Sequence, residues 1–186
     1  MQLTNNHSRY GAISRLLHWL MAALLIGQVA LGQYMVDLDY YDAWYHQAPS
    51  IHRSVGLLIA LLLLLRFVWR VTNTAPDPIG RPWEIVISHW LHRLFYLLIL
   101  LLAVSGYLLS TADGHAIVVF DWLKIPATLS GIDQQEDIAG EIHEWLVWLL
   151  VFLVSIHALA ALKHHFIDKD AVLNRMLGRT EPPNQK

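Results

Sequence analysis

Two histidines near the C-terminal end of the chain, His143 and His157, have a spacing that suits chemistry on one face of a helix. They are fourteen residues apart, which is almost four turns at about 3.6 residues per turn, so both imidazole rings leave the same side. At a rise of about 1.5 Å per residue, the two rings lie roughly 21 Å apart along the helix axis. Imidazole nitrogens are common metal ligands. The spacing therefore favours a helix that holds two cofactors at two depths.

The composition indicates a membrane protein. Of the 186 residues, 55% are hydrophobic and 15% are charged, and the mean hydropathy is +0.40. These values lie well away from those of an ordinary soluble domain. The sequence has no cysteine, which excludes structural disulfides, iron–sulfur clusters and thiolate catalysis. We expect residues 1–186 to form a single membrane domain.

Four apolar stretches are long enough to cross a hydrocarbon core about 30 Å thick. They cover residues 14–35, 51–71, 89–111 and 141–165. The connection at 72–88 contains helix-breaking prolines and a glycine, and the connection at 112–140 is long enough to hold a short interfacial helix. Residues 178–186 form a polar C-terminal tail. We therefore predict an all-α, integral membrane four-helix bundle.

Lysine and arginine are distributed unevenly between the two sides of these predicted spans. Eleven of the thirteen lie at the chain ends, in the second connection or at the adjoining span ends, and only Arg53 and Lys124 lie on the other side. Because cytoplasmic segments carry the excess of positive charge, we expect both termini in the cytoplasm. The outer side carries ten acidic residues, namely Asp37, Asp39, Asp42, Asp113, Asp121, Asp133, Glu136, Asp137, Glu141 and Glu144.

This orientation gives each membrane histidine a depth. His18 lies about one turn inside the first span, and His157 lies about two turns from the inner end of the fourth, so they share a level near the cytoplasm. His52 and His143 begin the second and fourth spans at the outer face. Ionisable residues within membrane spans are costly and usually functional. The four histidines therefore sort into an inner pair and an outer pair.

Haem fits such pairs because the porphyrin already supplies four nitrogens and leaves two axial positions that histidine commonly fills. One residue from each of two facing helices is enough, which suits a four-helix bundle. We predict that His18 and His157 bind the iron of an inner haem, and that His52 and His143 bind the iron of an outer one. With both faces of the iron closed, such a haem transfers electrons. His92, near the inner pair, is a rival axial ligand.

Two further interpretations accompany this one. Arg53 follows His52 directly, and its positive charge makes it a candidate contact for the anionic haem propionates. A histidine-lined metal transporter is an alternative of another class. It requires ligands that meet at one depth, and the separation of His143 and His157 opposes it.

Several segments of the chain resemble the bacterial cytochrome b-561 family of di-haem membrane cytochromes. They are Leu17–Trp19, Ile51–Gly56, His89–His92, Glu141–Glu144, Ile156–Ala158 and Lys163–His165. The resemblance implies a multi-pass protein of the bacterial inner membrane with two b-type haems and the same two histidine pairs as ligands. It also implies electron exchange with ubiquinone, for which Arg81, His92 and His164 are the candidate contacts on the cytoplasmic side.

Some members of this family resemble superoxide oxidases, which pass an electron from superoxide to quinone. A positive outer surface would attract superoxide, whereas the outer side of this chain has ten acidic and two basic residues. We therefore expect a basic or neutral redox protein in the periplasm as the partner, with superoxide:ubiquinone oxidoreductase as the alternative. We expect no nucleic-acid partner.

Overall fold

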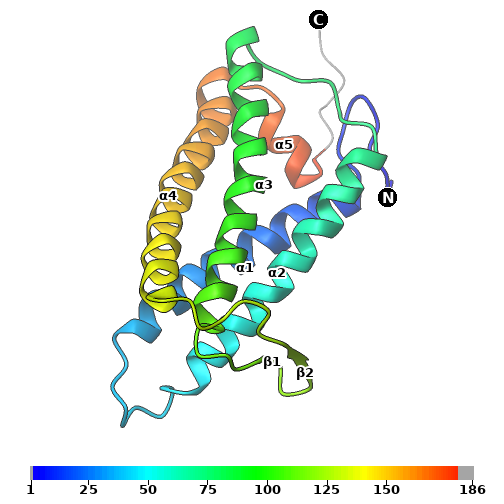
Figure 1. Cartoon of the computed structure of the whole chain (residues 1–186). Helices are drawn as coiled ribbons and strands as arrows, with labels where there is room; N and C mark the ends of the chain where they lie inside the picture. Colours follow the sequence, from blue (N-terminus) through cyan, green and yellow to red (C-terminus); the bar gives the residue numbers. More distant parts are fainter. Residues whose placement is uncertain (1, 180–186) are drawn as a thin grey trace, which may run out of the picture.

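Four long helices make up most of the structure, a computed structural model that describes residues 2–179 (Figure 1). They are α1 (Ala12–Val36), α2 (Gln47–Thr72), α3 (Pro82–Ser110) and α4 (Gln135–Lys163). The last helix continues as a π-helical turn, η1 (His164–Asp168), which is followed by the short helix α5 (Val172–Leu177). Between α3 and α4 the chain forms an antiparallel hairpin of β1 (Ile117–Val119) and β2 (Leu123–Ile125).

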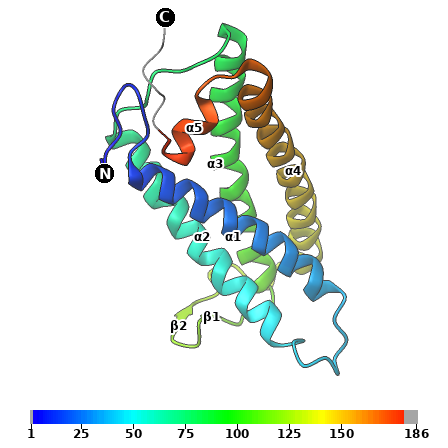
Figure 2. The ribbon, with the colours of Figure 1, turned by 180° about the vertical axis from the view of Figure 1, so that it is seen from behind.

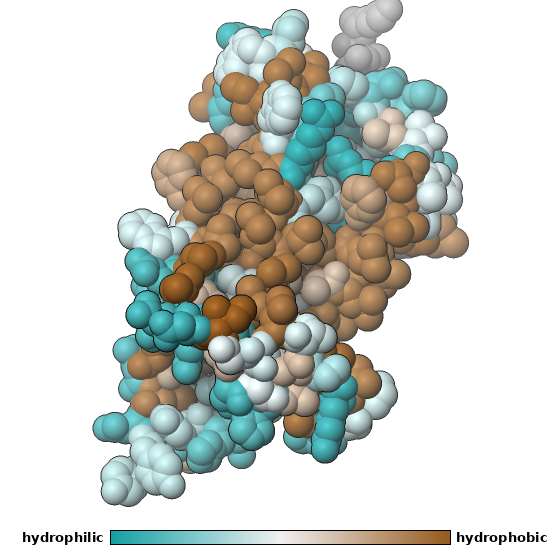
Figure 3. All heavy atoms as spheres, viewed as in Figure 1, coloured by the Kyte–Doolittle hydropathy of each residue, from teal (hydrophilic) through white to brown (hydrophobic). Residues whose placement is uncertain are grey.

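Each of the four long helices contains an 18-residue segment apolar enough to cross a membrane, and the mean hydropathies of these segments lie between 1.5 and 2.3. The face shown in Figure 3 carries a broad hydrophobic belt with polar groups at both ends. In a bilayer a helix satisfies its own backbone groups, so apolar side chains can face lipid without penalty. The predicted all-α membrane four-helix bundle is confirmed.

Three helices begin at least four residues before the predicted spans, because a hydropathy pattern detects only the part that lies in hydrocarbon. They begin at Gln47, Pro82 and Gln135 instead of 51, 89 and 141. The start of α3 shows what decides the boundary. Pro82 is the first helical residue, where its missing N–H is not needed, and a Glu84 carboxylate oxygen accepts a 2.8 Å hydrogen bond from the Arg81 backbone N–H.

The connection at 112–140, for which a short interfacial helix was one possibility, contains the β-hairpin instead. Ile117 and Val119 are buried while Val118 between them is exposed, the alternation of a strand with one covered face. The Phe120 backbone N–H donates to the Ser54 hydroxyl at 3.0 Å and so fixes the hairpin to α2. The packing partner on α2, which hydropathy does not show, decides the local structure.

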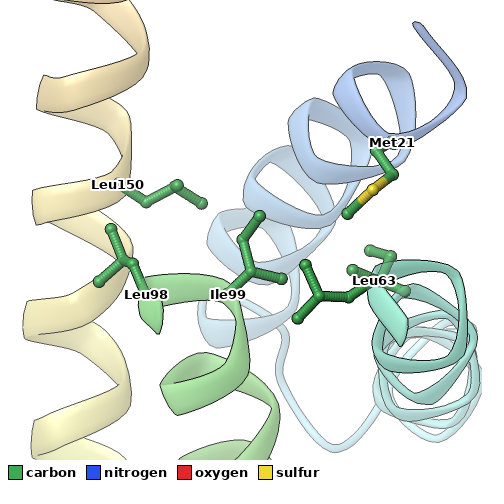
Figure 4. Close-up of a cluster of buried hydrophobic side chains, with 6 residues drawn as sticks. Met21, Leu63, Leu98, Ile99 and Leu150 are labelled. Carbon is green, nitrogen blue, oxygen red and sulfur yellow. The ribbon is translucent and has the colours of Figure 1, made fainter. Parts of the chain in front are cut away.

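A small hydrophobic core fills the middle of the bundle (Figure 4). It consists of Met21, Ile59, Leu63, Leu98, Ile99 and Leu150. Consecutive long helices are neighbours, α1 with α2, α2 with α3 and α3 with α4. Leu150 lies midway between His143 and His157 on α4. The core therefore separates the level of one histidine pair from that of the other.

The start of α1 and the helix α5 lie at the same end of the bundle, as Figure 1 and Figure 2 show from opposite sides. We call this the inner end, after the orientation predicted from charge, and the opposite end the outer end. The Trp19 indole N–H donates to the Met176 carbonyl at 3.0 Å and joins α1 to α5.

Candidate functional site

The outer histidines face each other from α2 and α4. The ring centroids of His52 and His143 are 6.3 Å apart. Both side chains are partly buried, and Gln28 of α1 contacts the same region, since its side-chain N–H donates to the His52 backbone carbonyl at 2.8 Å. The helices α1, α2 and α4 therefore meet at this level.

Ser105 determines which nitrogen of His143 carries the proton. Its hydroxyl donates to the Leu102 carbonyl at 3.2 Å and lies 3.0 Å from the His143 Nδ1. Because the hydroxyl proton is already used, the oxygen accepts from an Nδ1–H group. This tautomer leaves the Nε2 lone pair free, as in metal-binding histidines whose other ring nitrogen donates to a neighbouring acceptor.

Two glycines make room for the outer rings. A Cβ on Gly106 of α3 would lie 3.2 Å from His143 Cε1, and a Cβ on Gly32 of α1 would lie 3.3 Å from His52 Cε1. Both distances are shorter than ordinary van der Waals contacts. By contrast, Gly27 has open space around it. Glycine at positions 32 and 106 lets the helix backbones approach the two imidazoles.

The inner histidines face each other from α1 and α4. The ring centroids of His18 and His157 are 6.4 Å apart. The His92 ring of α3 lies closer to His157, at 5.6 Å. An Arg66 guanidinium nitrogen lies 3.3 Å from the His18 Nδ1. A guanidinium only donates, so this contact requires a lone pair on Nδ1.

The ring separations fit two axial ligands on one iron. An imidazole nitrogen lies about 2.0 Å from a first-row metal ion and about 1.2 Å from its own ring centre, so two opposed ligand rings have centres about 6.4 Å apart. The 6.3 Å and 6.4 Å separations match this value, whereas the 5.6 Å between His92 and His157 is too short. In addition, the His52 Nδ1 is buried and has no hydrogen-bond partner among the described residues. The ring separations of both pairs therefore fit haem, and His18 suits the inner site better than His92.

The inner site fits haem through Nε2 only if Arg66 moves. The present contact puts the ring proton of His18 on Nε2, and that nitrogen must lose it to bind iron. Arg66 is a partly buried cation on α2. An anionic group near the pair would give it another partner.

The predicted quinone contacts lie in two separate places. His92 lies among the inner rings, and its Nδ1 is 3.4 Å from the Ser88 hydroxyl. Arg81 caps the start of α3, and beside it Gly80 lies against the His164 ring, with Cε1 3.5 Å from where a Cβ would be. Eleven residues of α3 separate Arg81 from His92, about 16 Å of helix.

His164 belongs to a charged cluster at the inner ends of α3 and α4. Its Nδ1 lies 2.6 Å from an Asp170 carboxylate oxygen. Lys163 bridges the Glu84 and Asp168 carboxylates at 2.6 and 2.7 Å. Although Glu84, His164 and Asp168 are close enough to bind one metal ion, the ammonium group already neutralises the two carboxylates. The cluster is therefore an ion-pair network that joins α3 to η1.

The outer end is strongly acidic. All ten acidic residues predicted for this side are exposed. Within residues 2–179, none of them forms an ion pair with lysine or arginine; Asp113 pairs with His115, whose backbone and ring N–H groups lower the pKa of the Asp113 carboxyl. Arg53, the candidate propionate contact, is also exposed. The outer surface therefore carries a negative field near His52 and His143.

Sequence reasoning missed Ser105 and Arg66 as neighbours of the histidine rings. Ser105 is the polar residue of an otherwise apolar segment and directly precedes Gly106, which is a signal that could have identified it. Arg66 is an ionisable residue within a predicted span, and such residues are functional candidates.

Comparison with known proteins gives consistent matches over almost the whole chain. A family model described as prokaryotic cytochrome b561 matches residues 9–179. Cytochrome b561 homolog 2 of Escherichia coli (strain K12) is 47% identical, over 97% of this chain and 97% of the relative. Probable superoxide oxidase CybB of Yersinia pestis is 26% identical, over 92% of this chain and 97% of the relative. Cytochrome b561 homolog 1 of Escherichia coli (strain K12) is 23% identical, over 92% and 98%.

Proposed function

The chain belongs to the prokaryotic cytochrome b561 family of electron-transferring membrane cytochromes, which carry b-type haem, and we propose that it connects a periplasmic redox partner with ubiquinone through two haems. The protein is a bacterial membrane protein, and we propose the inner membrane as its location. The observation that carries the proposal is the presence of two imidazole pairs at opposite ends of one bundle, with ring centroids 6.3 and 6.4 Å apart.

In this proposal His18 and His157 hold the inner haem, and His52 and His143 hold the outer one. A haem bound by two imidazoles supplies reversible one-electron chemistry and has no iron position left for another ligand. Because α4 contributes one ligand to each site, a single helix fixes the distance between the two haems, roughly 21 Å along its axis between the ligating residues.

The surrounding residues tune and protect these ligands. Ser105 holds the proton of His143 on Nδ1, and hydrogen bonding at that nitrogen makes the imidazole a more basic ligand. The core around Leu98 and Leu150 excludes water between the two levels. Arg53 directly follows His52 at the outer end, and Arg66 contacts His18 at the inner end. We propose that each arginine balances the charge of haem carboxylates.

The haem content of the purified protein tests the proposal. We expect two b-type haems per chain by pyridine haemochrome, and one haem in His143→Ala. The matched control is His115→Ala, which removes an exposed loop histidine and is expected to keep both haems. A colourless protein from haem-replete cells, or an unchanged haem count in His143→Ala, would contradict the assignment.

The acidic outer end favours a cationic or neutral electron donor. A negative surface raises the local concentration of a basic protein and lowers that of an anion, changing association rates by about 10- to 1,000-fold at low salt. The second candidate function is oxidation of superoxide, because one relative is named a probable superoxide oxidase. Stopped-flow mixing with superoxide separates the two. We expect slow haem reduction, and reduction near the diffusion limit would establish the second candidate instead.

We propose that ubiquinone exchanges electrons at the inner end. His92 is the best candidate contact, because its ring lies 5.6 Å from that of His157; Arg81 and His164 are candidates farther toward the inner surface. His92→Phe is expected to slow quinone-linked haem oxidation and to leave both haems bound. His89→Phe, an exposed histidine on the same helix, is the control. Equal quinone kinetics in the two variants would contradict a role for His92.

A further inference from the structure

A pocket at the inner end is lined by four arginines that electron transfer does not use. The cavity has a volume of about 160 Å³. Its lining residues are Gln2, Arg9, Tyr10, Arg15, Arg175, Gly178 and Arg179. They come from the segment before α1, from the first turn of α1, and from α5 and the residues that follow it. Segments far apart in the sequence therefore meet around one concentration of positive charge.

The arginines on the α1 and α5 sides of the pocket are held in place. Arg15 is partly buried, and its guanidinium lies so close to Gly178 that a Cβ there would overlap it. Gly178 has a φ of 75°, a conformation that glycine adopts without strain. Arg175 donates from a guanidinium nitrogen to the Asp77 carbonyl at 2.7 Å. Two of the four cations are thus fixed before any ligand arrives.

Among residues 2–179, no acidic side chain lines the pocket to balance them. None of the seven lining residues is acidic, and the Asp77 carboxylate beside them lies 3.2 Å from the His7 Nδ1 instead. The Arg15 Nε is buried and has no hydrogen-bond partner in the described part of the chain. A buried donor without a partner and several like charges close together are both unfavourable. An anion that accepts several N–H groups relieves both, and phosphate matches the arginine fork well.

The depth of the pocket identifies the source of the anion. Arg15 lies in the first turn of a membrane-spanning helix. One turn further into the membrane, Trp19 donates to Met176, and Trp69 at the same end donates to the Ser14 hydroxyl at 2.8 Å. Tryptophan indoles of this kind mark the level of the lipid headgroups. We propose that this pocket binds the phosphate of an anionic phospholipid, and that the lipid joins α5 to α1.

Native mass spectrometry of the haem-loaded protein in neutral detergent tests the proposal, with phosphatidylglycerol and phosphatidylcholine as probes. We expect phosphatidylglycerol to remain bound at lower lipid concentration than phosphatidylcholine. Arg15→Gln and Arg175→Gln are each expected to weaken phosphatidylglycerol binding about fivefold. Arg93→Gln is the matched control, because Arg93 lies over the Trp90 ring at the same end and does not line the pocket.

Four results would overturn the proposal. Equal binding of the two lipids would show that the pocket does not select an anionic lipid. If Arg93→Gln weakened binding as much as the pocket variants do, general surface charge would be responsible. Inorganic phosphate could displace phosphatidylglycerol at equal concentration, which would indicate a soluble phosphate ligand. Loss of inner haem in Arg15→Gln with unchanged lipid binding would assign Arg15 to a haem carboxylate. If Arg15→Gln does not fold, the exposed Arg179 gives the same comparison as Arg179→Gln.

Discussion

Ser105→Ala provides a sharp test of the outer site, because Ser105 touches a predicted ligand without being one. The serine is only 5% exposed, and its hydroxyl accepts from the His143 Nδ1 and donates to the Leu102 carbonyl. Alanine removes this acceptor with little change in volume. The imidazole then loses the group that fixes both its tautomer and its orientation.

The expected effect of Ser105→Ala on the outer haem follows from the role of hydrogen-bond partners of ligating histidines. Loss of a hydrogen bond to the outer nitrogen of a ligating histidine lowers metal affinity by about 10- to 100-fold. Because the Ser105 hydroxyl is neutral, we expect the loss of outer-haem retention to be about tenfold. The His143 imidazole also becomes less basic, which favours ferrous over ferric iron. If the tenfold effect falls entirely on the ferric form, the outer midpoint potential rises by about 59 mV.

Spectroscopic redox titration and haem transfer to an apoprotein acceptor measure both quantities. The inner haem of the same molecule is an internal control, since its midpoint is expected to stay constant. Ser155→Ala is the matched variant, because the Ser155 hydroxyl is exposed and donates only to the Val151 carbonyl of its own helix at 2.8 Å. If Ser105→Ala and Ser155→Ala have the same outer midpoint and the same haem retention, the role derived for Ser105 is wrong.

Three further outcomes are expected. His157→Ala is expected to lose the inner haem and keep the outer one, as counted by pyridine haemochrome; loss of only the outer haem would invert the assignment. Gly32→Leu is expected to displace the His52 ring and lower outer-haem occupancy several-fold, whereas Gly27→Leu, with open space around it, is expected to leave occupancy unchanged, and equal occupancies would argue against the close approach. Reduction by a cationic donor protein is expected to slow as salt is added, because the acidic outer end is screened; a rate independent of ionic strength would remove electrostatic steering from the account.

The local sequence was most informative where one physical effect dominates. Four long apolar helices follow from hydropathy, because the hydrocarbon core demands apolar residues over a fixed length. The depth of each histidine follows from helical rise and from the position of the span. The rings of His18 and His157, and those of His52 and His143, indeed lie side by side, while their role as haem ligands stays a prediction.

The sequence was less informative where two segments must meet. The hairpin at 117–125 depends on a contact with Ser54 of α2, and no local sequence pattern predicts that contact. The bond between Ser105 and His143 joins residues of different helices, and the close approach of Gly106 to the same ring depends on how α3 and α4 pack. The quinone candidates Arg81 and His92 share a helix yet lie about 16 Å apart along it.

The sequence by itself determined that this is a four-helix membrane protein and at which level each histidine lies, because span length and helical rise are properties of single segments. Only the tertiary structure decided which ring centroids approach to about 6.4 Å and which ring nitrogen of His143 carries the proton. It also decided that four arginines from both ends of the chain surround one pocket. Those features depend on distances between helices, and side-chain packing across helix interfaces sets such distances.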